Sequence, residues 1–529
     1  MFYKLTSVLY TDVDNYDIAL VTSSMMAEDN WCLFLNPLLC LLLRGLTELY
    51  RGGDWFTTLS HLGVFMGAWT VAFCILKKES IENPEKTAAL LWLILLLTRL
   101  NLWNANFTVL SAFFCFVGYY TAFSAESDSP KKNWIAVLFV VLGSLWRYET
   151  ALLFLPFAGL RMAAGLFEHS DDRERRKHIL SSGAVLIATV LFLTGIQLIS
   201  FQLPSHADSV RYSQARSAIA DYPMREWDEI EENAQINEID YRAARAWNLT
   251  DTEHLTTECL EQFARAGRRT ATGEEMWDSL MGFFHDWRGH LLFLFFWLIC
   301  LMLRCWKNKN RVTRITSMLS VLGMGLILLY YIRLGRAPVR VVDSVFLACY
   351  SVLMTVPAEK KSGRKEKMVQ KASIAVLTLA LAATIIGSER KPVQWALLSN
   401  TGNQKMIEEL ETENNDLYIW KDYYLQISSR YMSAGKFTPT NMIQHHISGG
   451  DWMYGQKYHQ ELLQEVNAKN PALALLDREN TWYVATSPDL MLQILQEHYG
   501  DGIRSEMCGS VLNENCWKFY REEDAGNAA

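Results

Sequence analysis

Long apolar runs alternate with short charged connections along most of the chain. Between residues 55 and 387, ten runs approach the roughly 20 residues that a bilayer-spanning helix needs. They lie at 55–76, 87–103, 105–124, 133–147, 150–167, 179–200, 289–305, 313–332, 339–357 and 371–387. Lysine and arginine collect in every second connection, as is typical of cytoplasmic loops. The pattern predicts an α-helical polytopic membrane domain over residues 55–387.

The connections on the opposite face carry a different charge pattern. The longest, residues 201–288, holds nine arginines and seventeen acidic residues but no lysine. Because cytoplasmic loops are rich in lysine as well as arginine, we expect this loop to lie outside the cytoplasm. The same alternation predicts an integral membrane protein whose C-terminal part is also extracytoplasmic.

Residues 388–529 lose the long apolar runs. Short strand-like runs at 416–420, 472–476, 482–485 and 517–520 accompany a helical pattern at 489–499, which predicts a soluble α/β domain. Cys508 and Cys516 flank a turn-like segment and are consistent with either a hairpin disulfide or two free thiols.

The first 54 residues form an N-terminal outer region. The apolar run from Trp31 to Leu43 contains Pro37 and is soon followed by charged residues. These features favour an amphipathic helix lying on the membrane surface over a crossing. An outside N-terminus then has no span to carry it across, so we expect a first transmembrane helix to be missing upstream.

Composition limits the function classes. The net charge of −7 gives no reason to expect nucleic acid as a partner. The ten cysteines and eleven histidines show no zinc-type spacing, and the sequence has no phosphate-binding loop. The lipid bilayer is therefore the first partner that the sequence indicates.

Charged residues that could serve chemistry gather on the predicted outer face. Arginine at membrane depth is rare and points to a functional partner, and a phosphate suits several converging guanidinium groups. Arg99 fits an ordinary interfacial arginine better. The acidic stretch Asp12, Asp14 and Asp17 fits either a helix N-cap or a catalytic or metal-binding role. The candidate phosphate-binding residues are Arg147 with Glu149, Arg211, Arg216, Arg333, Arg336 and Arg340.

Several segments resemble the GT-C superfamily of membrane glycosyltransferases, and within it a branch found in gut Firmicutes. The resemblance is carried by the first acidic stretch, Phe34-Leu-Asn-Pro-Leu38, Asp54-Trp55, Arg211-Tyr-Ser-Gln-Ala-Arg216, Asp221-Tyr-Pro223 and Gly335-Arg-Ala-Pro-Val-Arg340. It covers residues 8–357, and its motifs are loose. It implies a GT-C-like bundle in a bacterial plasma membrane, followed by the α/β domain.

The resemblance also implies an activity. A sugar would move from a polyprenyl-phosphate donor to a glycan or lipid-linked acceptor outside the cytoplasm, with Asp14 as general base and Asp12 in reserve. Asn15 stands where relatives have Asp, so the identity of the base and the need for a divalent cation, held by Asp12, Asp14 or Asp17, stay open. A polysaccharide polymerase, and a transporter or flippase for a lipid-linked saccharide, remain the alternatives.

Overall fold

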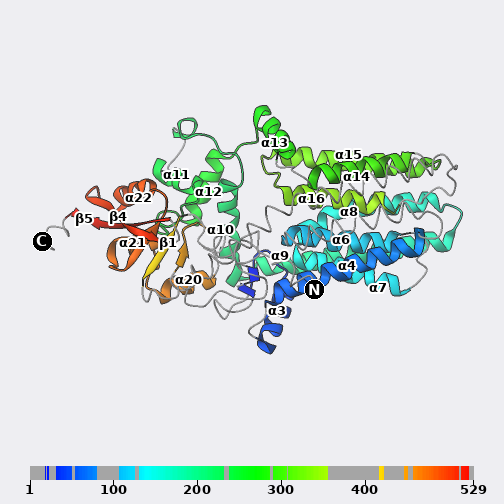
Figure 1. The fold of residues 1–529 in the computed structure, drawn as a ribbon, viewed down its shortest axis with the longest axis horizontal. Helices are drawn as coiled ribbons and strands as arrows, with labels where there is room; N and C mark the ends of the chain where they lie inside the picture. Colours follow the sequence, from blue (N-terminus) through cyan, green and yellow to red (C-terminus); the bar gives the residue numbers. More distant parts are fainter. Residues whose placement is uncertain are drawn as a thin grey trace.

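The structure is a computed structural model with two parts, a helical bundle and a mixed α/β body that we call the cap (Figure 1). The cap comprises the described residues of 204–285 and 416–522. The structure describes residues 18–19, 21–22, 31–50, 54–79, 106–124, 130–231, 237–285, 290–306, 308–355, 416–421, 446–450, 457–511 and 514–522.

The bundle confirms the predicted membrane domain where the structure describes it. Its helices are α4 (Trp55–Glu79), α6 (Phe107–Phe123), α7 (Pro130–Trp146), α8 (Tyr148–Glu168), α9 (Arg173–Phe201), α14 (His290–Trp306), α15 (Arg311–Arg333) and α16 (Val339–Leu353). By length and composition, four of the described helices can cross a membrane, namely α4, α8, α9 and α15. The runs predicted at 87–103 and 371–387 lie outside the described residues.

Helix α6 forms the centre of the bundle and is buried along nearly its whole length. It packs most closely on α7, where Gly143 allows the two backbones to approach. A Cβ atom at this position would lie 3.0 Å from the carbonyl oxygen of Ser111. Small residues at such contacts are typical of packed membrane helices.

Helix α3 (Pro37–Leu49) runs across the bundle axis at the end nearest the cap (Figure 1). Its 13 residues are too few to cross a bilayer. Leu39 and Leu43 are buried against the bundle, whereas Leu41 and Leu42 are exposed. This arrangement agrees with the surface helix predicted for this run, not with a crossing.

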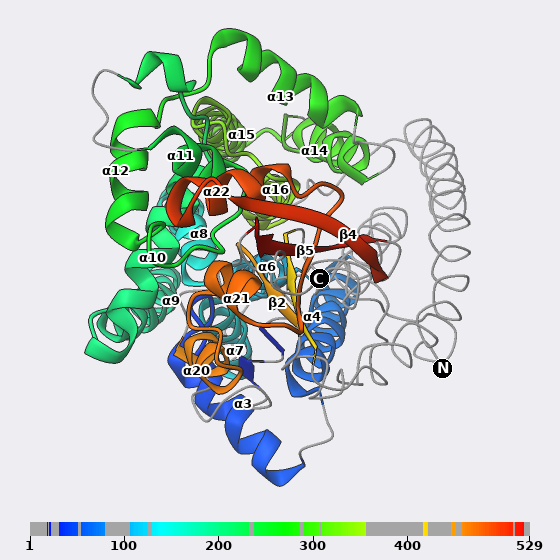
Figure 2. The same cartoon turned by 90° about the vertical axis from the view of Figure 1, so that its left-hand side faces the viewer.

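The cap combines two segments that are far apart in the sequence. The first contributes α10 (Pro204–Ala220), η1 (Trp227–Glu229), α11 (Glu238–Arg245), α12 (Thr257–Gly267) and α13 (Gly273–His285). The second contributes α20 (Lys457–Glu465), α21 (Pro471–Asp477), α22 (Asp489–Tyr499) and the strands β1 (Leu417–Trp420), β2 (His446–Ser448), β3 (Thr481–Val484), β4 (Ile503–Val511) and β5 (Glu514–Arg521). The strand order is β2-β1-β3-β5-β4, with β2, β1 and β3 parallel and the β3–β5–β4 pairs antiparallel (Figure 2).

One hydrophobic core joins the two segments of the cap. Tyr241 and Phe263 from the first segment and Ile419 and Leu495 from the second belong to the same buried cluster. The loop 201–288 and the C-terminal region were predicted as separate units on the same face, and the structure places both at one end of the bundle (Figure 1).

One detail of the predicted α/β domain is wrong, and one open alternative is decided. The run 472–476 is helical, because Asn470 caps the amide of Ala472 and Pro471 occupies the first turn of α21. The hairpin β4–β5 forms without a disulfide between Cys508 and Cys516. Cys516 is buried and Cys508 exposed. The other three strand-like runs and the helix at 489–499 are confirmed.

Candidate functional site at the bundle–cap boundary

The acidic stretch with Asp12, Asp14 and Asp17 lies outside the described residues, as does Arg99. The described chain begins at Ile18, whose side chain is buried in the core of the bundle. Further on, the buried Trp31 stacks on His206 of α10, with ring centroids 4.0 Å apart. The N-terminal region therefore meets the boundary between bundle and cap.

Asn36 fixes this region by three hydrogen bonds. Its side-chain oxygen accepts from the amide of Leu38 and so caps α3, while its Nδ2 donates to the carbonyl of Leu193 on α9. Its own amide donates to the carbonyl of Leu145 on α7. The Asn-Pro motif of the sequence is thus a buried anchor that holds α3 on the bundle. Asp54, from the next motif, likewise accepts from the amide of Thr57 at the start of α4.

Arg147 marks the break between α7 and α8, where two short crossings were predicted to meet. Its guanidinium lies over the ring of Phe107 at 4.8 Å and over that of Phe34 at 5.5 Å. It donates to Thr108 Oγ1 at 3.2 Å and lies 3.5 Å from Glu149 Oε2. The side chain is 21% exposed. Arg147 is therefore positioned by aromatic rings and retains one partly exposed edge.

Two motifs from the resemblance touch each other, and we call this contact the junction. The junction consists of Asp221, Tyr222 and Pro223 after α10 and Gly335 and Arg336 between α15 and α16. Arg336 Nη2 lies 2.7 Å from Asp221 Oδ2, and Nη1 donates to Tyr222 Oη at 3.3 Å. Gly335 has φ +68°, and a Cβ there would collide with the ring of Pro223. Only glycine suits this position, because it tolerates both the left-handed backbone and the close approach.

The remaining arginines differ in their partners. Arg211 is exposed and bonds Glu261 with two nitrogens and Glu258 with a third, which links α10 to α12. Arg216 is buried in the cap. Arg333 is exposed at the end of α15, and Arg340 is partly buried in the first turn of α16. The structure therefore brings Arg333, Arg336 and Arg340 onto one connection at the boundary, but not Arg211.

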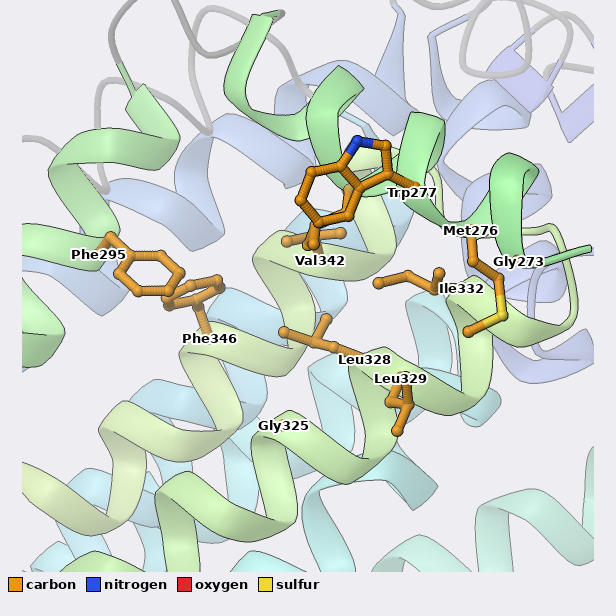
Figure 3. A pocket seen from close by; sticks show the side chains of 11 residues that line it. Gly273, Met276, Trp277, Phe295, Gly325, Leu328, Leu329, Ile332, Val342 and Phe346 are labelled. Atoms are coloured by element: carbon orange, nitrogen blue, oxygen red, sulfur yellow. The ribbon is translucent and has the colours of Figure 1, made fainter.

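An apolar groove of about 530 Å³ opens beside this connection (Figure 3). Helix α13 forms its roof with Met276 and Trp277, and α14 contributes Phe295. The floor and walls come from α15 and α16, with Leu328, Leu329, Ile332, Val342 and Phe346. The groove was not found from the sequence, because its residues look like ordinary lipid-facing positions. The sequence signal that could have revealed the groove is the apolar helix face with Trp277 and Leu280 within an otherwise acidic loop.

A capping box holds the roof of the groove. Thr272 Oγ1 accepts from the amide of Glu275, and Glu275 Oε2 accepts from the amide of Thr272. Arg269 grips both carboxylate oxygens of Glu275 at 2.6 and 2.7 Å. These hydrogen bonds, with that of Arg269 the largest contribution, lower the pKa of Glu275 to about 2. The start of α13 is therefore fixed next to the junction.

A polar cluster inside the cap also has metal-ligand residue types. Asp251, His254 and His498 have ligand atoms within 4.8 Å of one another. His254 Nδ1 lies 2.9 Å from Asp251 Oδ2, and His498 Nε2 lies 2.8 Å from Asp240 Oδ1. The two imidazole rings stack 3.7 Å apart at 9°.

This stacking argues against a metal bound by both histidines. A metal ion lies in the plane of each imidazole that binds it, because the ring nitrogen's lone pair is in that plane. Two nearly parallel planes that are stacked face to face cannot both contain one ion. The cluster is instead a hydrogen-bonded network, in which Tyr499 and Asn470 also donate to Asp251. Asp251 is fully buried.

The bundle and its long apolar helices define an integral membrane protein with an α/β cap. No protein-family model and no curated protein matches the chain. The crystal structure of ArnT from Cupriavidus metallidurans bound to undecaprenyl phosphate is similar over 98% of this chain and 95% of that chain, with 10% identity and a TM-score of 0.41. The apo state of that protein is similar over the same shares, with 11% identity and a TM-score of 0.39. At these TM-scores the likeness is loose, so the function proposed below rests on this chain's own residues.

Proposed function

We propose that the chain is a membrane glycosyltransferase that transfers a sugar from a polyprenyl-phosphate donor to an extracytoplasmic glycan or lipid-linked acceptor. The observation that carries this proposal is the apolar groove between α13 and helices α14–α16, next to a connection with three arginines. A polyprenyl chain is apolar and its phosphate is anionic. Such a ligand needs an apolar groove at membrane depth with cations at one end, and this boundary supplies both.

The arginines would stabilise the leaving group. Arg333 follows Ile332 of the groove directly, and Arg340 precedes Val342 by two residues. As the bond between the sugar and the phosphate breaks, negative charge grows on the departing polyprenyl phosphate. Positioned guanidinium groups lower the energy of that charge. Arg336 would act from the junction, and Arg147 with Glu149 from the break between α7 and α8.

The general base comes from the resemblance of the N-terminal stretch. Asp14, or Asp12 in its place, would take the proton of an acceptor hydroxyl while the hydroxyl oxygen attacks the anomeric carbon of the sugar. The proton then resides on the carboxylate, and polyprenyl phosphate leaves from the opposite side. A divalent cation held by Asp12, Asp14 or Asp17 would serve the same step by polarising the hydroxyl.

Transfer from a polyprenyl-phosphate sugar in isolated membranes tests the proposal. Asp14→Asn should lower the rate by about 10²–10⁴-fold with expression unchanged, because asparagine still caps a helix but cannot accept the proton. Asp12→Asn should match that loss if a metal is bound, in which case added divalent ion should partly restore transfer, whereas a loss in Asp12→Asn alone would make Asp12 the base. Full activity in these two variants and in Asp17→Asn would remove the acidic stretch from the site.

A second pair of variants tests the groove. Leu328→Trp fills the groove from α15 and should raise the KM for the donor. Leu326→Trp is the matched control, because Leu326 lies on the same helix, is exposed and does not line the groove. Equal donor KM values for the two variants would show that the groove does not hold the polyprenyl chain.

A further inference from the structure

Arg216 is a buried charge for which the described residues provide no counter-ion. The residue lies on α10 and is 7% exposed. Within the described part of the chain, its Nε and Nη1 have no hydrogen-bond partner, which leaves three of its five N–H donors unmet. Within the described part of the chain, Arg211 on α10 and Asp221 directly after this helix form ion pairs, but Arg216 does not.

The surroundings of Arg216 are apolar and aromatic. Residues three or four positions away share its helix face, and Tyr212 and Ile219 there belong to the hydrophobic core of the cap. The guanidinium lies over the indole of Trp247 at 4.7 Å. Trp247 has φ 59°, an uncommon left-handed conformation for a bulky residue. Such conformations persist where the surrounding structure enforces them, often at ligand sites.

The turn that carries Trp247 is held against the carboxyl end of a parallel strand. The amide of Leu249 donates to the carbonyl of Gly449, directly after β2, at 2.6 Å. Gly450 packs on the carbonyl of Trp247 so closely that a Cβ atom would clash. Arg216, which lies over the indole of Trp247, is therefore near the carboxyl end of this strand.

A buried charge of this kind is costly unless it is paired, and an anion is the partner that removes the cost. We propose that Arg216 and Trp247 form an anion site that binds an acidic group of the acceptor, a phosphate or a carboxylate. The assignment of this anion to the acceptor rests on the proposed function, whereas the anion site itself does not.

The position on α10 separates this site from the donor groove. Ser217 and Asp221 lie on the side of the helix away from Tyr212 and Ile219, and both contact Arg336 at the junction. Arg216 instead faces the core of the cap. An anion at Arg216 therefore approaches from the cap, whereas a polyprenyl phosphate in the groove meets the connection with Arg336.

Thermal unfolding of the purified full chain, with inorganic phosphate as the probe, tests the anion site. Phosphate should raise the Tm of the wild type in a saturable manner, because a ligand that binds only the folded state stabilises it. Chloride at matched ionic strength should not. Arg216→Met keeps an unbranched chain against Trp247 but removes the charge, so the phosphate-dependent rise should shrink to what Arg333, Arg336 and Arg340 contribute. Arg242→Met, at an exposed arginine of α11, should retain the full rise.

Two results would overturn the site. One is an equal rise in Tm for the wild type and Arg216→Met. The other is no rise in the wild type, and a lower Tm for Arg216→Met would then make Arg216 a packing residue of the core. If Arg216→Met does not fold, Arg216→Lys decides: it keeps the charge without the planar fork, and roughly tenfold more phosphate should be needed for the same rise.

Transfer kinetics test whether the anion belongs to the acceptor. Arg216→Lys should raise the KM for the acceptor and leave the KM for the polyprenyl-phosphate donor unchanged. A rise in the donor KM alone would assign the anion to the donor and refute the acceptor assignment. If the wild type shows no transfer at all, the proposed function and the acceptor assignment both fail, and the phosphate titration alone decides the anion site.

Discussion

The junction allows a quantitative prediction, because Arg336 is both a candidate phosphate ligand and one half of an ion pair. Sequence alone presents Arg336 as a free guanidinium, so Arg336→Lys would be expected to weaken donor binding without affecting the fold. The structure changes this expectation. Arg336 is 2.7 Å from Asp221, and Ser217 bonds both residues, at 3.0 Å to Arg336 and 2.6 Å to Asp221.

The exposure of the pair sets the size of the effect. The side chains are 33% and 21% exposed, between a surface pair and a buried one. Exposed pairs contribute about 0–1 kcal/mol, and breaking a buried pair costs about 3–5 kcal/mol. We therefore expect Arg336→Gln and Asp221→Asn, each of which removes one charge of the pair, to destabilise the protein, with a coupling energy between them of about 1–2 kcal/mol.

A double-mutant cycle measures this coupling through the thermal unfolding of the full chain in detergent. For a unit of 150–250 residues, 1 kcal/mol corresponds to about 2–4 °C in Tm. The control cycle uses Arg242→Gln and Glu238→Gln, which break an exposed pair at 4.0 Å, and should give a coupling below about 0.5 kcal/mol. If the two junction substitutions act additively, the ion pair does not hold the cap on the bundle and the reasoning from its geometry is refuted.

Three further predictions follow from buried or strongly paired carboxylates. Glu168→Gln should lower stability by about 3–5 kcal/mol in thermal unfolding, because it leaves the guanidinium of Arg161, paired at 3.0 Å and 7% exposed, without its charge partner. His498→Phe should keep the ring stack but leave the buried Asp240 without its partner, at a cost of about 1–3 kcal/mol, and zinc or a chelator should change the Tm of this variant no differently from that of the wild type. The pKa of Glu275 is lowered in the folded protein, so the contribution of this carboxylate to stability is present above pH 4.5 and is lost as the pH falls toward 2. Proteolysis of α13 should therefore increase as the pH falls from 4.5 to about 2 in the wild type, but not in Glu275→Gln.

Local sequence patterns predicted the elements of this fold because their causes are local. The length and composition of an apolar run determine whether it can cross a bilayer, and every predicted crossing within the described residues is a helix. The break at Arg147 was visible as charged residues between two short apolar runs. The run 472–476 was misread as a strand, since five apolar residues fit either structure and the capping role of Asn470 decided the outcome.

The contacts that build the candidate site could not be predicted in the same way. Arg336 and Asp221 form an ion pair although their residue numbers differ by 115, and no local sequence pattern predicts a contact between residues so far apart in the chain. The partners also determine which arginines are available: Arg211 is gripped by Glu258 and Glu261, whereas Arg216 has unmet donors. The sequence showed both only as arginines of one loop.

Backbone contacts explain why the groove and the junction keep a fixed relation. The segment between α12 and α13 hydrogen-bonds to both sides of the boundary: the amide of Arg269 donates to the carbonyl of Pro223, and the amide of Ala271 donates to the carbonyl of Arg333. The same Arg269 holds Glu275 at the start of α13, the roof of the groove. A shift of α13 must therefore strain contacts to Pro223 at the junction and to Arg333 at the end of α15. The roof of the groove and the backbone that carries Arg333 and the junction are thus held at one relative position by main-chain hydrogen bonds.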